Sequence, residues 1–186
     1  TLSLHDALPI SVSLSTNFAP KFTMQKELFE LSIFSIIVLA ASFPLRRISC
    51  ENVLVNGGFI RTWDDSLVVK NYPRWDNGSE GSTYNVHFKK IIVWTDLAQC
   101  LEIGYETYGK RMEDISFEDI IIIHAYHNAP ISIHNGNNAE IKNIKFKNIL
   151  IEDASMGQGN GKNYLIDFST EFSSTWSNGH GTTSLG

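Results

Sequence analysis

Four segments of this chain repeat one pattern, and that repeat limits the folds open to it. The segments are ENVLVNGGFI (51–60), YNVHFKKIIV (84–93), EDISFEDIII (113–122) and KNIKFKNILI (142–151). Their Asn or Asp residues, at positions 52, 85, 114 and 143, are spaced by 33, 29 and 29 residues. Each segment alternates polar and apolar residues, which is the period of a strand with one buried face. The repeat therefore predicts one structural unit that is used four times.

A second short strand is expected after each of these segments. The candidates are SLVVK (66–70), CLEIG (100–104), PISIH (130–134) and YLIDF (164–168). Strand-only units of this length, rich in Ile, Val and Asn, predict an all-β fold, a right-handed parallel β-helix of about four coils in which apolar faces stack. A β-sandwich with chance internal similarity is the alternative.

The repeat also predicts which side chains form columns through the stack. One buried column should contain Val53, Val86, Ile115 and Ile144. The Asn and Asp residues that begin each unit should lie above one another at a turn, where amide side chains can satisfy backbone groups.

Alternation in the second strands predicts the residues that point away from the core. One outward column is Val68, Glu102 and Ser132, and the next is Lys70, Gly104 and His134, to which we expect the fourth coil to add Asp167. These residues should form one solvent-facing groove, with Asp64 and Asp65 at its edge. Trp63 and Tyr105 flank it, as do Trp94, Tyr108, Tyr126 and His127, and aromatic rings beside carboxylates suit sugar rings. These aromatic residues could equally pack on one another.

Composition narrows the class of protein. The chain has 186 residues, of which 42% are hydrophobic, so it is long enough and apolar enough for one folded domain. The net charge of −5 gives no reason to expect a nucleic-acid partner. Cys50 and Cys100 show no metal-ligand spacing and are expected to be core thiols. We expect a monomer without a metal or a cofactor.

The segment 1–45 lacks the repeat, and we treat it as separate from the domain at 46–170 and the polar tail at 171–186. Residues 1–10, TLSLHDALPI, resemble the in-frame translation of a sequencing-adapter oligonucleotide. Residues 24–44 outline a secretory signal, although Glu27 and Glu30 spoil its positive end. No apolar run is long enough to predict a membrane span. We expect residues 1–23 to be loosely attached, no regular coil from 1–45, and an apolar helix over 28–41 that covers the open end of the stack.

The sequence WDDSLVVK (63–70) resembles a motif of the β-helical glycoside hydrolases, the polygalacturonase family (family 28) and the related dextranase–isopullulanase family (family 49). The resemblance covers about residues 48–170. It implies an inverting glycosidase acting on a pectin-like or glucan-like poly- or oligosaccharide, with Asp64 as general acid and Asp65 helping to activate water. It also implies substrate contacts from Trp63, Lys70, Gln99, Glu102, Ser132, His134 and Tyr105.

The chain departs from the family pattern at three places. Gln99 stands where polygalacturonases have the histidine of a Gly-His-Gly motif, and Ser132 and His134 stand in the basic positions. This argues against a galacturonate substrate, whose carboxylate needs a cation. Phe43 stands where the family has a third aspartate, one coil before Asp64, so we expect a fragment truncated on its N-terminal side.

Two other functions remain open from the sequence. A non-catalytic β-helix that binds carbohydrate or serves as a structural spike has no need for the Asp64–Asp65 pair. A polysaccharide lyase would use acidic residues that hold calcium, and the sequence shows no such acidic cage.

We predict that residues 46–186 by themselves hydrolyse glycans weakly or not at all. General acid–base assistance is worth roughly 10²–10⁴-fold per positioned group, and the family's third aspartate is missing. The test compares reducing-end release from pectic, dextran-like and other glucans by this chain and by a version with its upstream coils restored. Comparable turnover by the two would show that the third aspartate is dispensable.

Overall fold

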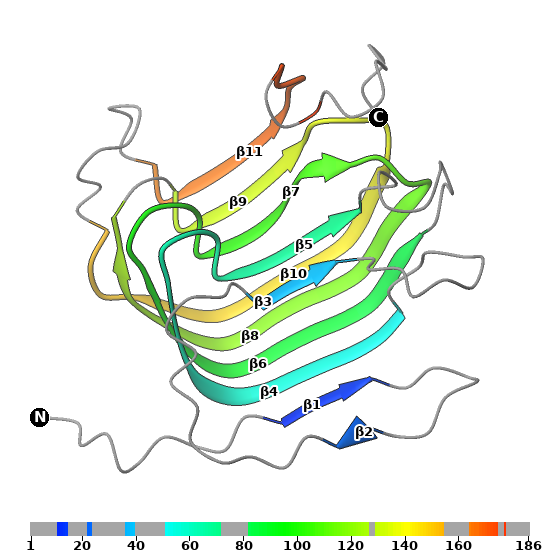
Figure 1. The fold of residues 1–186 in the computed structure, drawn as a ribbon. Coiled ribbons are helices and arrows are strands. Elements are labelled where there is room, and N and C mark those ends of the chain that lie inside the picture. The colour runs from blue at the N-terminus through cyan, green and yellow to red at the C-terminus, as the bar shows by residue number, and fades with distance from the viewer. Residues whose placement is uncertain are drawn as a thin grey trace, which may run out of the picture.

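The computed structural model describes residues 11–14, 22–23, 36–39, 51–71, 82–126, 129–154, 164–174 and 177. Within these residues every regular element is a strand, and the strands form two sheets (Figure 1). The described part of the chain therefore contains no helix that is long and apolar enough to cross a membrane. The prediction of an all-β fold is confirmed.

The first sheet has six strands in the order β10, β8, β6, β4, β1, β2. Its four long strands come from the four repeated segments: β4 (Glu51–Thr62), β6 (Thr83–Thr95), β8 (Arg111–Ala125) and β10 (Glu140–Ile151). Neighbours among these four are parallel. The short strand β1 (Ser11–Leu14) pairs antiparallel with β4, and the short strand β2 (Phe22–Thr23) pairs antiparallel with β1.

The second sheet has five strands in the order β11, β9, β7, β5, β3, all of them parallel. Their bounds are β3 (Ile36–Leu39), β5 (Leu67–Asn71), β7 (Leu101–Thr107), β9 (Ile131–Asn135) and β11 (Ile166–Thr170). Four of the five correspond to the second strands expected from the sequence. In Figure 1 each of the four long strands is followed along the chain by a strand of the other sheet, and after β5, β7 and β9 the next strand is again a long one.

The predicted column of Val53, Val86, Ile115 and Ile144 is present, because each residue lies opposite the next in parallel register. The first three are buried. Ile144 is only partly buried, since β10 is the edge strand of its sheet and has a neighbour on one side.

Residues with positive φ interrupt each long strand twice, five positions apart. The first set is Asn52, Asn85, Asp114 and Asn143, with φ of 60°, 57°, 53° and 55°, and the second is Gly57, Lys90, Asp119 and Asn148, with φ of 80°, 56°, 57° and 53°. Asn, Asp and Gly tolerate this left-handed conformation best. The Nδ2 of Asn85 donates to the Oδ1 of Asn52, as expected for an amide ladder. The long strands bend along their length as a result (Figure 1).

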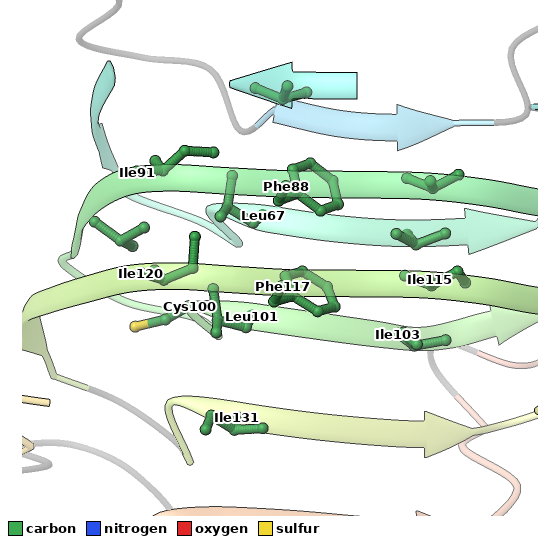
Figure 2. Close-up of a cluster of buried hydrophobic side chains, with 14 of the residues drawn as sticks. Leu67, Phe88, Ile91, Cys100, Leu101, Ile103, Ile115, Phe117, Ile120 and Ile131 are labelled. Carbon is green, nitrogen blue, oxygen red and sulfur yellow. The ribbon is translucent and has the colours of Figure 1, made fainter. Parts of the chain in front are cut away.

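The hydrophobic core lies between the two sheets. Figure 2 shows Phe88 and Phe117 of the long strands facing Leu67, Leu101 and other apolar residues of the short strands. Phe117 stacks between Phe88 and Phe146, with ring centroids 5.0 Å and 5.1 Å apart. Cys100 is a free, fully buried thiol of this core, as expected, and Cys50 lies outside the described residues.

Part of the N-terminal segment forms strands, so three expectations for it are wrong. β3 pairs in parallel register with β5, where Ile36 lies opposite Leu67, although residues 1–45 were expected to add no regular coil. The helix expected over 28–41 is a strand at 36–39, and the pairing of β1 with β4 contradicts loose attachment at 11–14. Without a further strand, the edges of β4 and β5 would expose unpaired backbone groups. β1 and β3 pair with these edges. Phe43 lies outside the described residues.

The predicted place of Asp167 is also wrong. It lies opposite Ser132 and therefore in the column of Glu102, whereas Ser169 lies opposite His134. The strand β11 begins two residues later than the sequence pattern suggested, and a shift of two residues keeps the face of each side chain but changes its column.

We predict that Phe117→Ala destabilises the fold by about 3–5 kcal/mol, because it removes a fully buried ring from the middle of a stack. Denaturant unfolding monitored by circular dichroism measures this. Phe59→Ala, which truncates a phenylalanine that is 42% exposed on β4 of the same sheet, is the matched control and should cost less than about 1 kcal/mol. Equal losses in the two variants would contradict the importance of the stack.

Candidate functional site

The Asp64–Asp65 pair lies in the turn between β4 and β5. Adjacent side chains on a regular strand point to opposite faces, so both carboxyls can serve one site only from a turn or a bulge. Buried hydroxyls fix this turn: the Oγ of Ser66 lies 2.6 Å from the Oγ1 of Thr62 and 2.7 Å from the Oγ1 of Thr95. The two acids differ in environment, since Asp64 is exposed and Asp65 is buried. The Oδ1 of Asp64 accepts the backbone N–H of Asp65 at 2.8 Å.

Lys70 on β5 joins two carboxylates. Its Nζ lies 3.2 Å from the Oδ2 of Asp65 and 3.1 Å from the Oε2 of Glu106 on β7. The Oδ1 of Asp65 accepts the backbone N–H of Gln99 at 3.2 Å. Both carboxylate oxygens of Asp65 are therefore held by donors, so the turn and the neighbouring coil are tied together at this point.

Burial and charge compete at Asp65 and Lys70. Burial raises the pKa of Asp65 above its ordinary value, although Lys70 and the N–H of Gln99 oppose this. Burial alone would lower the pKa of Lys70, but the charges of Asp65, Glu106 and Glu102 outweigh it and raise the pKa well above its ordinary value. Lys70 is therefore a permanent cation in this site.

His134 on β9 lies between two further carboxylates. Its Nδ1 is 2.9 Å from the Oε1 of Glu102 on β7, and its Nε2 is 3.4 Å from the Oδ2 of Asp167 on β11. The ring of Tyr105 stacks on the imidazole, with centroids 4.4 Å apart and planes 13° apart. We call Asp65, Lys70, Glu102, Glu106, His134 and Asp167 the polar cluster.

The Glu102–His134 pair holds a proton more tightly than either group does in water. Burial raises the pKa of Glu102 to about 7, against the opposing hydrogen bond from His134. Burial alone would lower the pKa of His134, but its contacts with Glu102 and Asp167 raise it. Asp65 and Lys70 both act electrostatically on Glu102, which connects the two halves of the polar cluster.

The prediction that these residues share one side of the fold agrees with the structure, but the prediction of a solvent-facing groove is wrong for six of them, the buried residues Asp65, Val68, Glu102, Gly104, Ser132 and His134. Glu102, Ser132 and His134 are 2%, 0% and 4% exposed. Side chains of adjacent strands lie over one another here, as Tyr105 does over His134. Ser132 is fully buried, and its hydroxyl points to the carbonyl oxygen of Leu101 at 3.5 Å.

The flanking aromatic residues differ in what their rings contact. Trp63 is 69% exposed next to Asp64, so its ring is accessible to a ligand. Trp94 instead lies between the guanidinium of Arg61 and the imidazole of His124, each 5.0 Å from its ring centroid. The sequence left open whether these aromatic residues contact a ligand or pack on neighbouring side chains. Trp94 and Tyr105 pack on neighbouring side chains. His127 lies outside the described residues.

Sequence reasoning missed Glu106, because β7 departs from the repeat. The register between β5 and β7 shifts by two residues after Val69, where a bulge begins, so no alignment of the repeats brings Glu106 beside Lys70. Gly104 lies in this bulge at φ +124°, and a Cβ there would meet the carbonyl oxygen of His134 at 2.1 Å. A glycine inside a strand was the available signal.

Among the described residues, no three His, Cys, Asp or Glu side chains gather where they could hold one metal ion. Comparison with known proteins finds no family model, no curated protein and no solved structure that matches this chain.

We predict that the free energy of unfolding decreases as pH rises from about 4.5 to about 7. Glu102 has a raised pKa in the fold, so its contribution is fully present below its ordinary pKa of 4.5 and is lost as pH rises through about 7. The raised pKa of His134 acts in the same direction above its ordinary value of 6.5. Urea unfolding at a series of pH values measures the slope.

Glu102→Gln should flatten this slope, because a shift of one pKa unit corresponds to about 1.4 kcal/mol. Glu140→Gln is the matched control, since Glu140 is exposed on β10, and it should leave the slope unchanged. An equal slope in all three proteins would exclude Glu102 as the source.

Proposed function

We propose that the chain is a fragment of a right-handed parallel β-helix of the glycoside hydrolase type, and that it acts on a neutral, glucan-like poly- or oligosaccharide. The fold proposal is supported by the in-register parallel pairing of four repeated units across two sheets. It is also supported by the left-handed residues that recur at the same two positions of every long strand.

One observation carries the functional proposal: an accessible carboxyl, that of Asp64, adjoins a buried carboxyl, that of Asp65, which a lysine holds. An inverting glycosidase needs one carboxyl that reaches the leaving oxygen and a second that activates water on the opposite side of the sugar. In this proposal Asp64 is the proton donor, because it is the exposed member of the pair. Asp65 assists with water, and Lys70 keeps it oriented.

The charge around the pair favours a neutral sugar. Five carboxyl groups lie in or beside the polar cluster, those of Asp64, Asp65, Glu102, Glu106 and Asp167, and they face two basic side chains, Lys70 and His134. Lys70 is already engaged by Asp65 and Glu106. A uronate would bring a further negative charge to a site without a cation for it, which like-charge repulsion opposes.

A non-catalytic carbohydrate-binding protein is the second candidate. The exposed ring of Trp63 favours it, because such a ring can stack on a sugar without any acid–base chemistry. Both carboxylate oxygens of Asp65 are bonded, one to Lys70 and one to the backbone N–H of Gln99, and this also fits a structural role for Asp65.

We predict that Asp64→Asn lowers reducing-end release from neutral glucans by roughly 10²–10⁴-fold relative to whatever the unaltered chain releases, while glycan binding is kept. Trp63→Ala should weaken binding. Asp114→Asn is the matched control, since three repeats carry Asn at the equivalent position, and it should change neither property.

Three results would count against parts of this proposal. If the unaltered chain hydrolyses glycans and Asp64→Asn hydrolyses them equally well, Asp64 is not the proton donor. Glycan binding that depends on Trp63, with no hydrolysis by any variant or by the chain with upstream coils restored, would favour the binding protein. Tighter binding of polygalacturonate than of neutral glucans would contradict the proposed substrate class.

A further inference from the structure

A second group of polar residues lies on the outer face of the long-strand sheet, away from the polar cluster. His87 and Asn85 are on β6, and Ser116 lies opposite His87 on β8. The Nδ1 of His87 is 2.7 Å from the Oγ of Ser116, and its Nε2 is 2.7 Å from the Oδ1 of Asn85. A serine, a histidine and an amide are thus joined in series by two short hydrogen bonds.

The hydrogen bonds of Asn85 determine which nitrogen of His87 carries the proton. The Nδ2 of Asn85 donates to the Oδ1 of Asn52, so the Oδ1 of Asn85 is the atom that faces His87. An oxygen acceptor requires a donor, so the Nε2 of His87 carries hydrogen. In the neutral ring the Nδ1 is then an acceptor, and the hydroxyl of Ser116 donates to it.

This is the arrangement of an activated serine nucleophile, in which a general base takes the hydroxyl proton and a third group orients the base. We propose that Ser116, His87 and Asn85 form a second reactive site, at which Ser116 is acylated by small carboxylic esters.

The surroundings of Ser116 fit a small acyl group. A surface depression of about 270 Å³ is lined by Asn85, His87, Ser116, Asn143 and Lys145 among others. Ser116 is 4% exposed and is one of the residues that line this depression. The volume lies below the range of sites for drug-sized ligands, which suits an acetyl group rather than a sugar chain.

The charged groups around His87 are those of Lys89 on its own strand, Asp114 and Glu118 on β8, and Lys145 on β10; the residue opposite it on β4 is Leu54, which is uncharged. Burial, with help from the two lysines, lowers the pKa of His87, so the ring is neutral at pH 7. Glu118 also accepts a hydrogen bond from Ser116. Because Ser116 has one hydroxyl proton, Glu118 and the Nδ1 of His87 compete for it as acceptors.

The reaction balances without a cofactor. The Oγ of Ser116 forms a bond to the carbonyl carbon of the ester while its proton passes to the Nδ1 of His87. The bond to the leaving alcohol breaks, and the alcohol takes that proton. Water then attacks the acyl-serine in the same way and releases the carboxylic acid and the free serine. The side chains of Lys89 and Lys145 lie near His87, and both are paired with Glu118, at 3.8 Å and 3.4 Å.

The test is covalent labelling of the full chain by a fluorophosphonate, followed by peptide mapping. We expect phosphonylation at Ser116, with a rate that rises with pH as His87 loses its proton. His87→Gln should slow labelling by about 10²-fold or more, and Ser116→Ala should abolish it. Asn85→Gly keeps the left-handed conformation available while removing the amide, and it should slow labelling by roughly 10-fold.

Ser66 is the internal control, because its buried hydroxyl is bonded to Thr62 and Thr95 and should stay unlabelled. Hydrolysis of p-nitrophenyl acetate that follows the same order of variants would support the proposal independently. Labelling of Ser116 no faster than of Ser66, or labelling that His87→Gln does not slow in a variant with unchanged circular dichroism, would overturn it.

Discussion

The in-register stacking of parallel strands is the constraint on which the rest of this structure depends. Each long strand must bend at the same two positions as its neighbour, or the next strand would lose its pairing. Left-handed residues at 52, 85, 114 and 143, and again five residues later, meet that requirement. Because the bends coincide, equivalent side chains lie one strand spacing apart, and the stack of Phe88, Phe117 and Phe146 follows directly.

The same stacking produces chemistry outside the core. A polar residue placed on one strand has a neighbour at the equivalent position of the next, so charges meet as columns and not singly. Buried charges are tolerated only when they are paired, and the polar cluster obeys this rule, with Lys70 between two carboxylates and His134 between two others. On the opposite sheet the same geometry aligns His87 with Ser116.

Much of this could be predicted from the sequence. The four long strands, their parallel register and the column from Val53 to Ile144 follow from a pattern repeated four times. The grouping of Lys70, Glu102 and His134 follows from alternation. What failed were departures from the repeat: the bulge of β7 brings in Glu106, the late start of β11 shifts Asp167, and β3 forms where a helix was expected. Single events of this kind carry no periodic signal.

The sequence by itself determined the four long strands, the four short strands that follow them and the side of the fold on which their polar residues lie, because alternation and a fixed repeat are local properties of the chain. Only the tertiary structure decided how deeply those residues are buried and which partners they have. Burial depends on side chains from strands about thirty residues away, as with Tyr105 over His134. The protonation of Glu102 and the hydrogen bond of Ser116 to His87 follow from that packing, since both depend on distances between strands.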